Sequence, residues 1–147
     1  MEPRKRRNAK MAVLAVVSLL SVAVPAAYAD SNRTVSGRGD SANFLCPSGV
    51  ATPATIQFSA TKNKGTLFGN FNIFGPTVSK FGTITGGSVN QNSFSLTGVV
   101  NFDTCGTFTS QLPATATITG DCGTGVTIHY SDTFGEVGDF LGTVACS

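Results

Sequence analysis

The chain has no tryptophan, a single histidine and few charged residues. Charged side chains make up 12% of its 147 residues, against about 25% in a typical globular protein. This argues against a nucleic-acid-binding protein, because such proteins cluster Lys and Arg against phosphates. His129 is the sole imidazole and no two cysteines lie close together, so the chain lacks a zinc-binding pattern. It also has no phosphate-binding loop and no dinucleotide fingerprint.

Basic residues and a short apolar run open the chain. Arg4 to Lys10 holds five of the ten basic residues, and an apolar run follows from Met11 to Val24. Ala27 and Ala29 then place small side chains at the spacing of a signal-peptidase site. We therefore predict a signal peptide over residues 1–29 and a secreted or cell-surface protein. An uncleaved membrane anchor is the alternative, although a spanning helix usually needs about 17 apolar residues or more.

The remaining residues, 30–147, have the length of one domain. They contain five basic and seven acidic residues, so their net charge is −2. No basic patch is left to attract nucleic acid or anionic lipid. We expect no cofactor, no metal and no membrane association after cleavage. A protein or a component of the cell envelope is the expected kind of partner.

Alternating apolar and polar residues predict strands throughout this part of the chain. Phe94, Leu96, Gly98, Val100 and Phe102, for example, should share one face of a strand. Turn-forming residues separate such stretches and leave no room for crossover helices. The expected strands cover residues 55–61, 64–74, 78–90, 93–102, 114–120, 125–131 and 137–146. This pattern predicts an antiparallel β-sandwich or an up-and-down barrel of about seven to nine short strands.

The expected single folded unit has two parts. Residues 30–54 form an N-terminal segment with one or two short strands, at 34–36 and 43–45, and residues 55–147 form the main antiparallel domain. Glycines within the expected strands mark bulges or sharp bends. They favour a closed or strongly coiled sheet over a flat one, and their positions are Gly69, Gly82, Gly98 and Gly142.

Four cysteines in a small exported chain predict two disulfides. In a simple up-and-down meander, Cys46 and Cys105 fall at one end, and Cys122 and Cys146 fall at the other. Because a disulfide needs Cα atoms within about 7 Å, the pairs Cys46–Cys105 and Cys122–Cys146 are favoured. An extra strand at residues 107–110 would reverse the direction of the later strands and is the weak step in this argument.

One group of acidic residues gathers at an expected turn: Asp132, Glu136 and Asp139. Paired carboxylates serve glycoside hydrolysis, and three carboxylates can bind Ca²⁺. We favour a solvated acidic hairpin loop, because such loops are usually exposed. On that interpretation, replacing all three side chains by amides should hardly change stability.

Three further motifs carry weaker signals. Asn32 starts an N-glycosylation pattern. Gly37 to Ser41 contains Arg38, Gly39 and Asp40 and resembles the cell-attachment peptide of fibronectin, which integrins recognise; the plainer interpretation is a flexible N-terminal segment. His129 alternates with apolar neighbours and should lie on the outer face, without a nucleophile motif to make it catalytic.

Together these features predict a secreted or cell-surface β domain with a structural or interaction role and no catalytic activity. A carrier of small apolar ligands in a Phe-lined barrel is the alternative, since the chain has 11 Phe. A hydrolase that uses the acidic group is a third hypothesis.

Overall fold

The structure, a computed structural model, describes residues 32–147, and the predicted signal peptide and its cleavage site lie outside them. Nine strands make up the described chain and no helix in it is long and apolar enough to cross a membrane. The strands are β1 (Asn32–Leu45), β2 (Ala51–Asn63), β3 (Thr66–Phe74), β4 (Val78–Val89), β5 (Ser93–Cys105), β6 (Phe108–Ser110), β7 (Ala114–Asp121), β8 (Gly123–Asp132) and β9 (Val137–Cys146).

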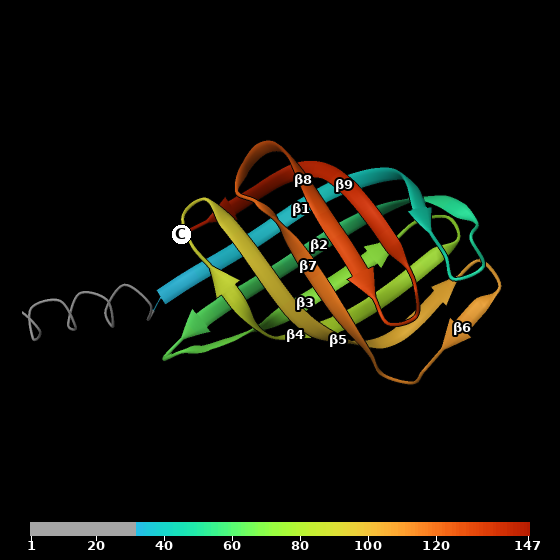
Figure 1. The fold of residues 1–147 in the computed structure, drawn as a ribbon, viewed down its shortest axis with the longest axis horizontal. Coiled ribbons are helices and arrows are strands. Elements are labelled where there is room, and N and C mark those ends of the chain that lie inside the picture. The colour runs from blue at the N-terminus through green and yellow to red at the C-terminus, as the bar shows by residue number, and fades with distance from the viewer. Residues whose placement is uncertain (1–31) are drawn as a thin grey trace, which may run out of the picture.

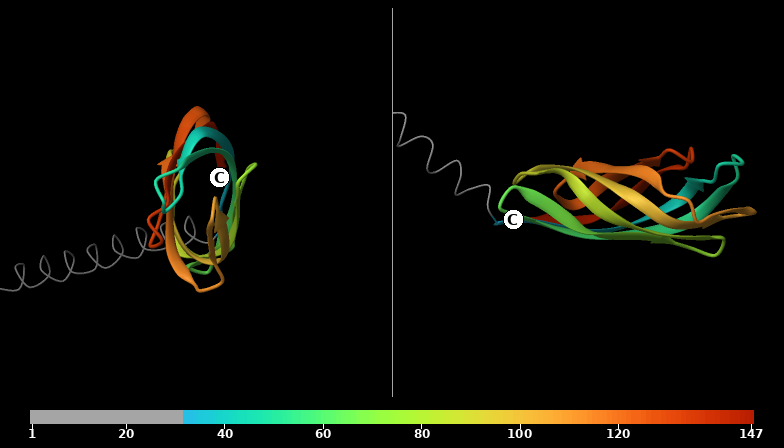
Figure 2. Two further views of the ribbon diagram at one scale, coloured as in Figure 1. Left: turned by 90° about the vertical axis from the view of Figure 1, so that its right-hand side faces the viewer. Right: turned by 90° about the horizontal axis from the view of Figure 1, so that it is seen from below.

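Eight of these strands close into an antiparallel barrel (Figure 1). The order around the sheet is β4-β3-β2-β1-β9-β8-β7-β5, and the pairing of β4 with β5 closes the ring. Viewed from the end, the barrel has a flattened, oval outline (Figure 2). The predicted all-β antiparallel fold is therefore confirmed, and of the two architectures left open by the sequence it is the up-and-down barrel, with β6 as one strand outside the ring.

Strand β1 differs from the expected N-terminal segment. The short strands expected at 34–36 and 43–45 are the two ends of one strand, which pairs with β2 on one edge and with β9 on the other. The flexible segment expected around Arg38 to Asp40 is wrong, because these residues pair along both edges of β1. Alternation along this stretch was hard to detect because Gly37 and Gly39 interrupt it.

The extra strand β6 does not reverse the later strands. It pairs with Asp103 to Cys105 of β5, whereas β7 pairs with Ser93 to Val100. Since β6 and β7 are both antiparallel to β5, they run in the same direction and the later parity is kept. Both predicted disulfides are confirmed, with Cα–Cα distances of 5.4 Å for Cys46–Cys105 and 5.9 Å for Cys122–Cys146. They tie opposite ends of the barrel.

The inward positions of the strands build one hydrophobic core. Aromatic rings contact one another inside the barrel, and the ring centroids of Phe58 and Phe94 lie 5.2 Å apart. Phe44 is fully buried and contacts both Tyr130 and Phe140, at 5.9 Å and 5.8 Å. Large side chains thus fill the part of the interior around these rings.

A bulge between β4 and β5 changes which residues face inward. Phe81 pairs with Phe102 but Gly82 pairs with Val100, so Asn101 is an extra residue on β5. An extra residue shifts the alternation that follows it. Phe102, expected on the inner face with Phe94, therefore lies outside and stacks on Phe81 with ring centroids 5.4 Å apart. The next residue, Asp103, is turned into the barrel and is fully buried.

Candidate functional site

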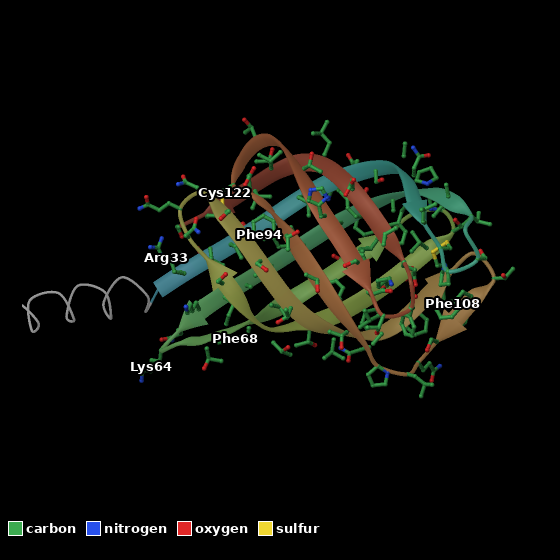
Figure 3. All side chains as sticks on the ribbon, viewed as in Figure 1. Arg33, Lys64, Phe68, Phe94, Phe108 and Cys122 are labelled. Carbon is green, nitrogen blue, oxygen red and sulfur yellow. A yellow bond between two sulfur atoms is a disulfide. The ribbon has the colours of Figure 1, made fainter. Side chains whose placement is uncertain are left out.

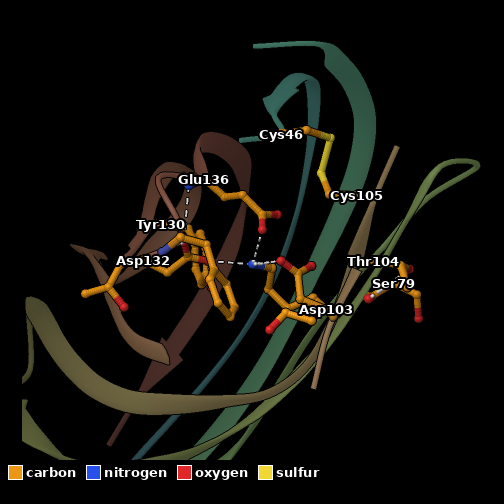
Figure 4. Close-up of polar contacts among 12 residues, drawn as sticks. Cys46, Ser79, Asp103, Thr104, Cys105, Tyr130, Asp132 and Glu136 are labelled. Atoms are coloured by element: carbon orange, nitrogen blue, oxygen red, sulfur yellow. Dashed lines mark hydrogen bonds and ion pairs between the residues drawn. A yellow bond between two sulfur atoms is a disulfide. The ribbon is translucent and has the colours of Figure 1, made fainter. Parts of the chain in front are cut away.

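A buried group of charged residues lies inside one end of the barrel, beside the Cys46–Cys105 disulfide (Figure 4). Its members are Lys80 of β4, Asp103 of β5, Asp132 of β8 and Glu136, which precedes β9. All four side chains are fully shielded from solvent. We call these four residues the lysine–carboxyl cluster.

The Lys80 ammonium is the centre of the cluster. Its Nζ atom contacts Oδ2 of Asp132 and lies 3.1 Å from Oε2 of Glu136 and 3.3 Å from Oδ2 of Asp103. Three aromatic rings surround the same nitrogen, with centroids 5.2 Å away for Tyr130, 5.7 Å for Phe134 and 6.0 Å for Phe44. One cation therefore faces three carboxyl groups within apolar walls.

The turn between β8 and β9 places Asp132. Its Oδ1 atom accepts hydrogen bonds from the backbone N–H groups of Phe134, at 3.0 Å, and Glu136, at 3.1 Å. Gly135 takes a positive φ of 90°, which suits a tight turn. Oδ2 of Asp132 accepts a hydrogen bond of 2.7 Å from the Tyr130 hydroxyl. Asp132 thus fixes the turn with one oxygen and meets Lys80 with the other.

Glu136 and Asp103 are less well satisfied. Apart from their ion pairs with Lys80, their carboxyl oxygens have no hydrogen-bond partner among the described residues. Burial, together with the neighbouring Asp103 carboxyl group, raises the pKa of Glu136 to about 9, although Lys80 opposes this rise. Glu136 therefore keeps a proton at neutral pH, and that proton can bridge the two carboxyl groups. Burial and the charge of Asp132 likewise raise the pKa of Tyr130, so its hydroxyl stays protonated.

The expected solvated acidic loop is wrong for two of its three members. Asp132 follows Ile128 and Tyr130 on the inner face, and Glu136 precedes Gly138 and Phe140 on the same face. Asp139 points outward instead, and its Oδ1 atom lies 2.5 Å from Nδ1 of His129 across β8 and β9. His129 is exposed, as predicted. The structure therefore brings together Asp132 and Glu136 but not Asp139.

Lys80 and Asp103 were missed in the sequence. Lys80 had a usable signal, because it alternates with Val78, Gly82 and Ile84 on one face of β4. Asp103 had none, because its inward position depends on the bulge at Asn101. Among residues 32–147 no group of His, Cys, Asp and Glu has the arrangement of a metal site. In the cluster, the Lys80 ammonium already lies between the carboxyl groups.

The other predicted positions lie elsewhere. Arg38 and Asp40 are on the outer face of β1, where Arg38 lies over the Phe74 ring and Asp40 accepts a 2.6 Å hydrogen bond from Thr55. Asn32 begins β1, and its side chain is outside the described part of the structure.

Several grooves mark the outer surface of the described residues, and two of them bear on the argument. One, of about 620 Å³, passes over β8 and β9 and includes His129 and Asp139. The other, of about 420 Å³, lies over β2 to β5, and we call it the amide groove. Amide and hydroxyl side chains line it beside the half-exposed ring of Phe81, namely Gln57, Ser59, Asn70, Asn72, Thr83 and Asn101.

Exposed phenylalanine rings extend the surface around the amide groove. Phe68 projects outward from β3 (Figure 3) and is 55% exposed, while Phe81 is 51% exposed. Gly82 permits the close packing beneath, because a Cβ atom there would lie 2.4 Å from the Phe71 ring. This part of the barrel therefore presents apolar rings next to neutral hydrogen-bonding groups.

The fold and these sites define a disulfide-linked, closed antiparallel β-barrel with a charged cluster inside one end. Comparison of the chain with protein-family models, curated proteins and solved structures returns no match.

Proposed function

We propose that the protein is a secreted or cell-surface binding module without catalytic activity, and that its amide groove holds a neutral, hydroxyl-rich ligand such as a glycan of the cell envelope. The composition of the groove carries this proposal. None of the side chains that line it, all in the described part of the chain, is ionisable. A charged partner would find no counter-charge there, whereas a neutral polar ligand can exchange its hydrogen bonds with water for hydrogen bonds with the amide and hydroxyl side chains.

The lining side chains match the chemistry of a sugar. Each amide both donates and accepts hydrogen bonds, as a sugar hydroxyl does. Asn101 donates a 3.1 Å hydrogen bond to Thr83, which holds its amide in place beside the groove. The Phe81 ring offers an apolar face to the C–H groups of a sugar ring. Together they favour a polyhydroxylated ligand over a purely apolar one.

The two other functions considered from the sequence have weaker support. A carrier of apolar ligands needs interior space, but Phe44, Phe58 and Phe94 pack against other aromatic rings inside the barrel. A hydrolase needs carboxylates that meet its substrate, but those of Asp132 and Glu136 are fully shielded from solvent. The predicted export signal and the two disulfides support a location outside the cytoplasm.

Co-sedimentation with insoluble glycans tests this proposal. Purified peptidoglycan, chitin and cellulose serve as probes, with the full chain exported and matured in its host. We expect binding to one of them, weakened about tenfold or more by the double substitution Asn70→Ala and Asn72→Ala, since two lost hydrogen bonds are worth about 1–3 kcal/mol. The matched control is Thr119→Ala with His129→Ala on the other groove, which should bind normally. Absence of binding to all three probes, or equal loss in both variants, contradicts the proposal.

A further inference from the structure

The lysine–carboxyl cluster holds a primary amine against a carboxyl group in a place that water does not reach. Lys80 comes from β4 and Asp132 from β8, and these strands are not neighbours in the barrel. We propose that the folded protein joins them covalently, by an intramolecular amide bond between Nζ of Lys80 and Cγ of Asp132. This inference concerns the interior of the barrel and does not depend on the proposed ligand.

Asp132 is the member of the cluster arranged to act as the electrophile. Two backbone N–H groups, of Phe134 and Glu136, point at its Oδ1 atom. Such a pair of donors stabilises the negative oxygen of a tetrahedral intermediate. The Tyr130 hydroxyl donates to Oδ2, the oxygen that must leave. Asp103 has no comparable donors, so its carbon is less activated.

Glu136 and Asp103 are placed to move the protons. Their oxygens lie 3.1 Å and 3.3 Å from Nζ of Lys80, within reach of the reacting amine. Burial and the Asp103 carboxyl group raise the pKa of Glu136 to about 9, so this carboxyl group carries a proton that it can give to Asp132. Contact with Nζ places the carboxyl groups of Glu136 and Asp103 to exchange protons with the amine directly.

The reaction balances without an added reagent. Asp103 takes a proton from the Lys80 ammonium, and Glu136 gives its proton to Oδ2 of Asp132. The neutral amine then forms the Nζ–Cγ bond. A second proton passes from Nζ through Glu136 to Oδ2, the Cγ–Oδ2 bond breaks and water leaves. The ammonium has lost two protons to the water, and Asp103 and Glu136 hold one proton between them before and after.

Burial favours the linked state. Holding the two groups in contact replaces an encounter in solution by an intramolecular step, which is worth a high effective concentration. Solvent is excluded from all four side chains, so the reverse hydrolysis lacks its water. The product is a covalent crosslink from β4 to β8, close to the Cys46–Cys105 disulfide.

Trypsin gives a direct test, because Lys80 is the last Lys or Arg in the sequence. The full chain is exported and matured in its host, then reduced, denatured and digested. An unlinked chain gives fragments 65–80 and 81–147. A linked chain gives one fragment, 65–147, because trypsin does not cleave at an acylated lysine. Its mass is one water lower than the mass calculated from the sequence of 65–147, because amide formation releases that water. We expect the single, lighter fragment, with tandem mass spectra that join Lys80 to Asp132.

Variants assign the bond and the proton transfer. Lys80→Arg should restore cleavage at residue 80 and the full mass, whereas the matched control Lys64→Arg should keep the lighter 65–147 sequence. Glu136→Gln should fold, by circular dichroism, but remain largely unlinked. Wild-type protein that yields both separate fragments at full mass overturns the proposal, as does a crosslink to Asp103. A Glu136→Gln protein that links as fast as wild type overturns the proton-transfer step.

Discussion

Lys80 and Asp132 meet inside the barrel although 52 positions separate them in sequence. Their strands are joined through β5 and β7 around the ring, so only the closed barrel brings the two side chains together. A charged pair of this kind adds little stability by itself, since desolvation offsets much of the attraction. Its partners make it specific, because Tyr130 and two backbone N–H groups fix Asp132 in place.

Removing the cation should therefore be costly. In the unlinked protein, Lys80→Met leaves Asp103, Asp132 and Glu136 buried without their cation, and breaking a buried ion pair from one side costs about 3–5 kcal/mol. In the linked protein the same variant removes the crosslink, which also lowers the free energy of unfolding. The matched control is Lys64→Met at the exposed β2–β3 turn, which should change the free energy of unfolding by no more than about 0.5 kcal/mol. Urea denaturation measures both. Similar small changes in the free energy of unfolding of the two variants would mean that the buried carboxyl groups tolerate the loss of Lys80.

Much of this fold was predictable, because alternation and turn residues are local signals. The barrel strands from β2 onward and both disulfides follow from them, and β6 did not disturb the argument because it runs with β7. The alternation along β8 also places Asp132 on the same inner face as Ile128 and Tyr130. What misled the interpretation was the assumption that carboxylates at a turn point into solvent.

The cluster itself was not predictable from local pattern. Asp103 faces inward because Asn101 is an extra residue in β5, and a bulge is a property of two paired strands. Glu136 is buried beside the Lys80 ammonium group of β4, which lies far away in the sequence. A local sequence pattern gives no sign of an ion pair between distant strands. The burial of Asp132 and Glu136 could therefore not be predicted.

The raised pKa of Glu136 predicts a stability that falls as the pH rises. The folded protein holds a proton up to about pH 9, whereas an ordinary glutamate releases it near 4.5. Between these values the unfolded chain binds fewer protons, so the free energy of unfolding should decrease steadily as the pH rises. The contribution is complete below pH 4.5 and is lost as the pH rises through 9.

Glu136→Gln removes this titration and keeps a similar shape. Because the variant should also remain largely unlinked, the slope of stability against pH reports the effect, and the absolute stability does not. Thermal denaturation at several pH values between 5 and 9 should give a flatter profile for the variant than for the wild type. Amide formation would consume Lys80 and Asp132 together and leave the Asp103–Glu136 pair, so the direction is the same in either state. A variant with the full wild-type slope would assign the dependence to another group.

The two disulfides should differ in both reduction and stability. Cys46 and Cys105 are buried, whereas Cys122 and Cys146 are partly exposed, so a mild thiol reagent should open Cys122–Cys146 first. The loops span 59 and 24 positions. In the chain-entropy model the Cys46–Cys105 bridge then contributes about 4 kcal/mol and the other about 3 kcal/mol. Urea denaturation of variants in which both cysteines of one bridge are replaced by serine measures the two stability contributions. Peptide mapping of the wild-type protein after partial reduction shows which bridge opens first. Earlier reduction of Cys46–Cys105 would contradict the first part.

Barrel closure at the β1–β9 seam should depend on Gly142. It lies opposite Gly39, and a Cβ atom at Gly142 would lie 1.9 Å from the backbone oxygen of Arg38. Because that atom is backbone rather than a flexible side chain, Gly142→Ala must push β1 and β9 apart. We expect the free energy of unfolding to decrease by about 1–3 kcal/mol or more. Gly86→Ala in β4 is the matched control, since its added Cβ would meet only the Thr97 hydroxyl oxygen, at 3.1 Å. Urea denaturation should separate the two variants clearly, and hydrogen exchange should show faster opening of β1 and β9 in Gly142→Ala alone. Equal stability of the two variants would mean that the seam tolerates a wider spacing than this packing implies.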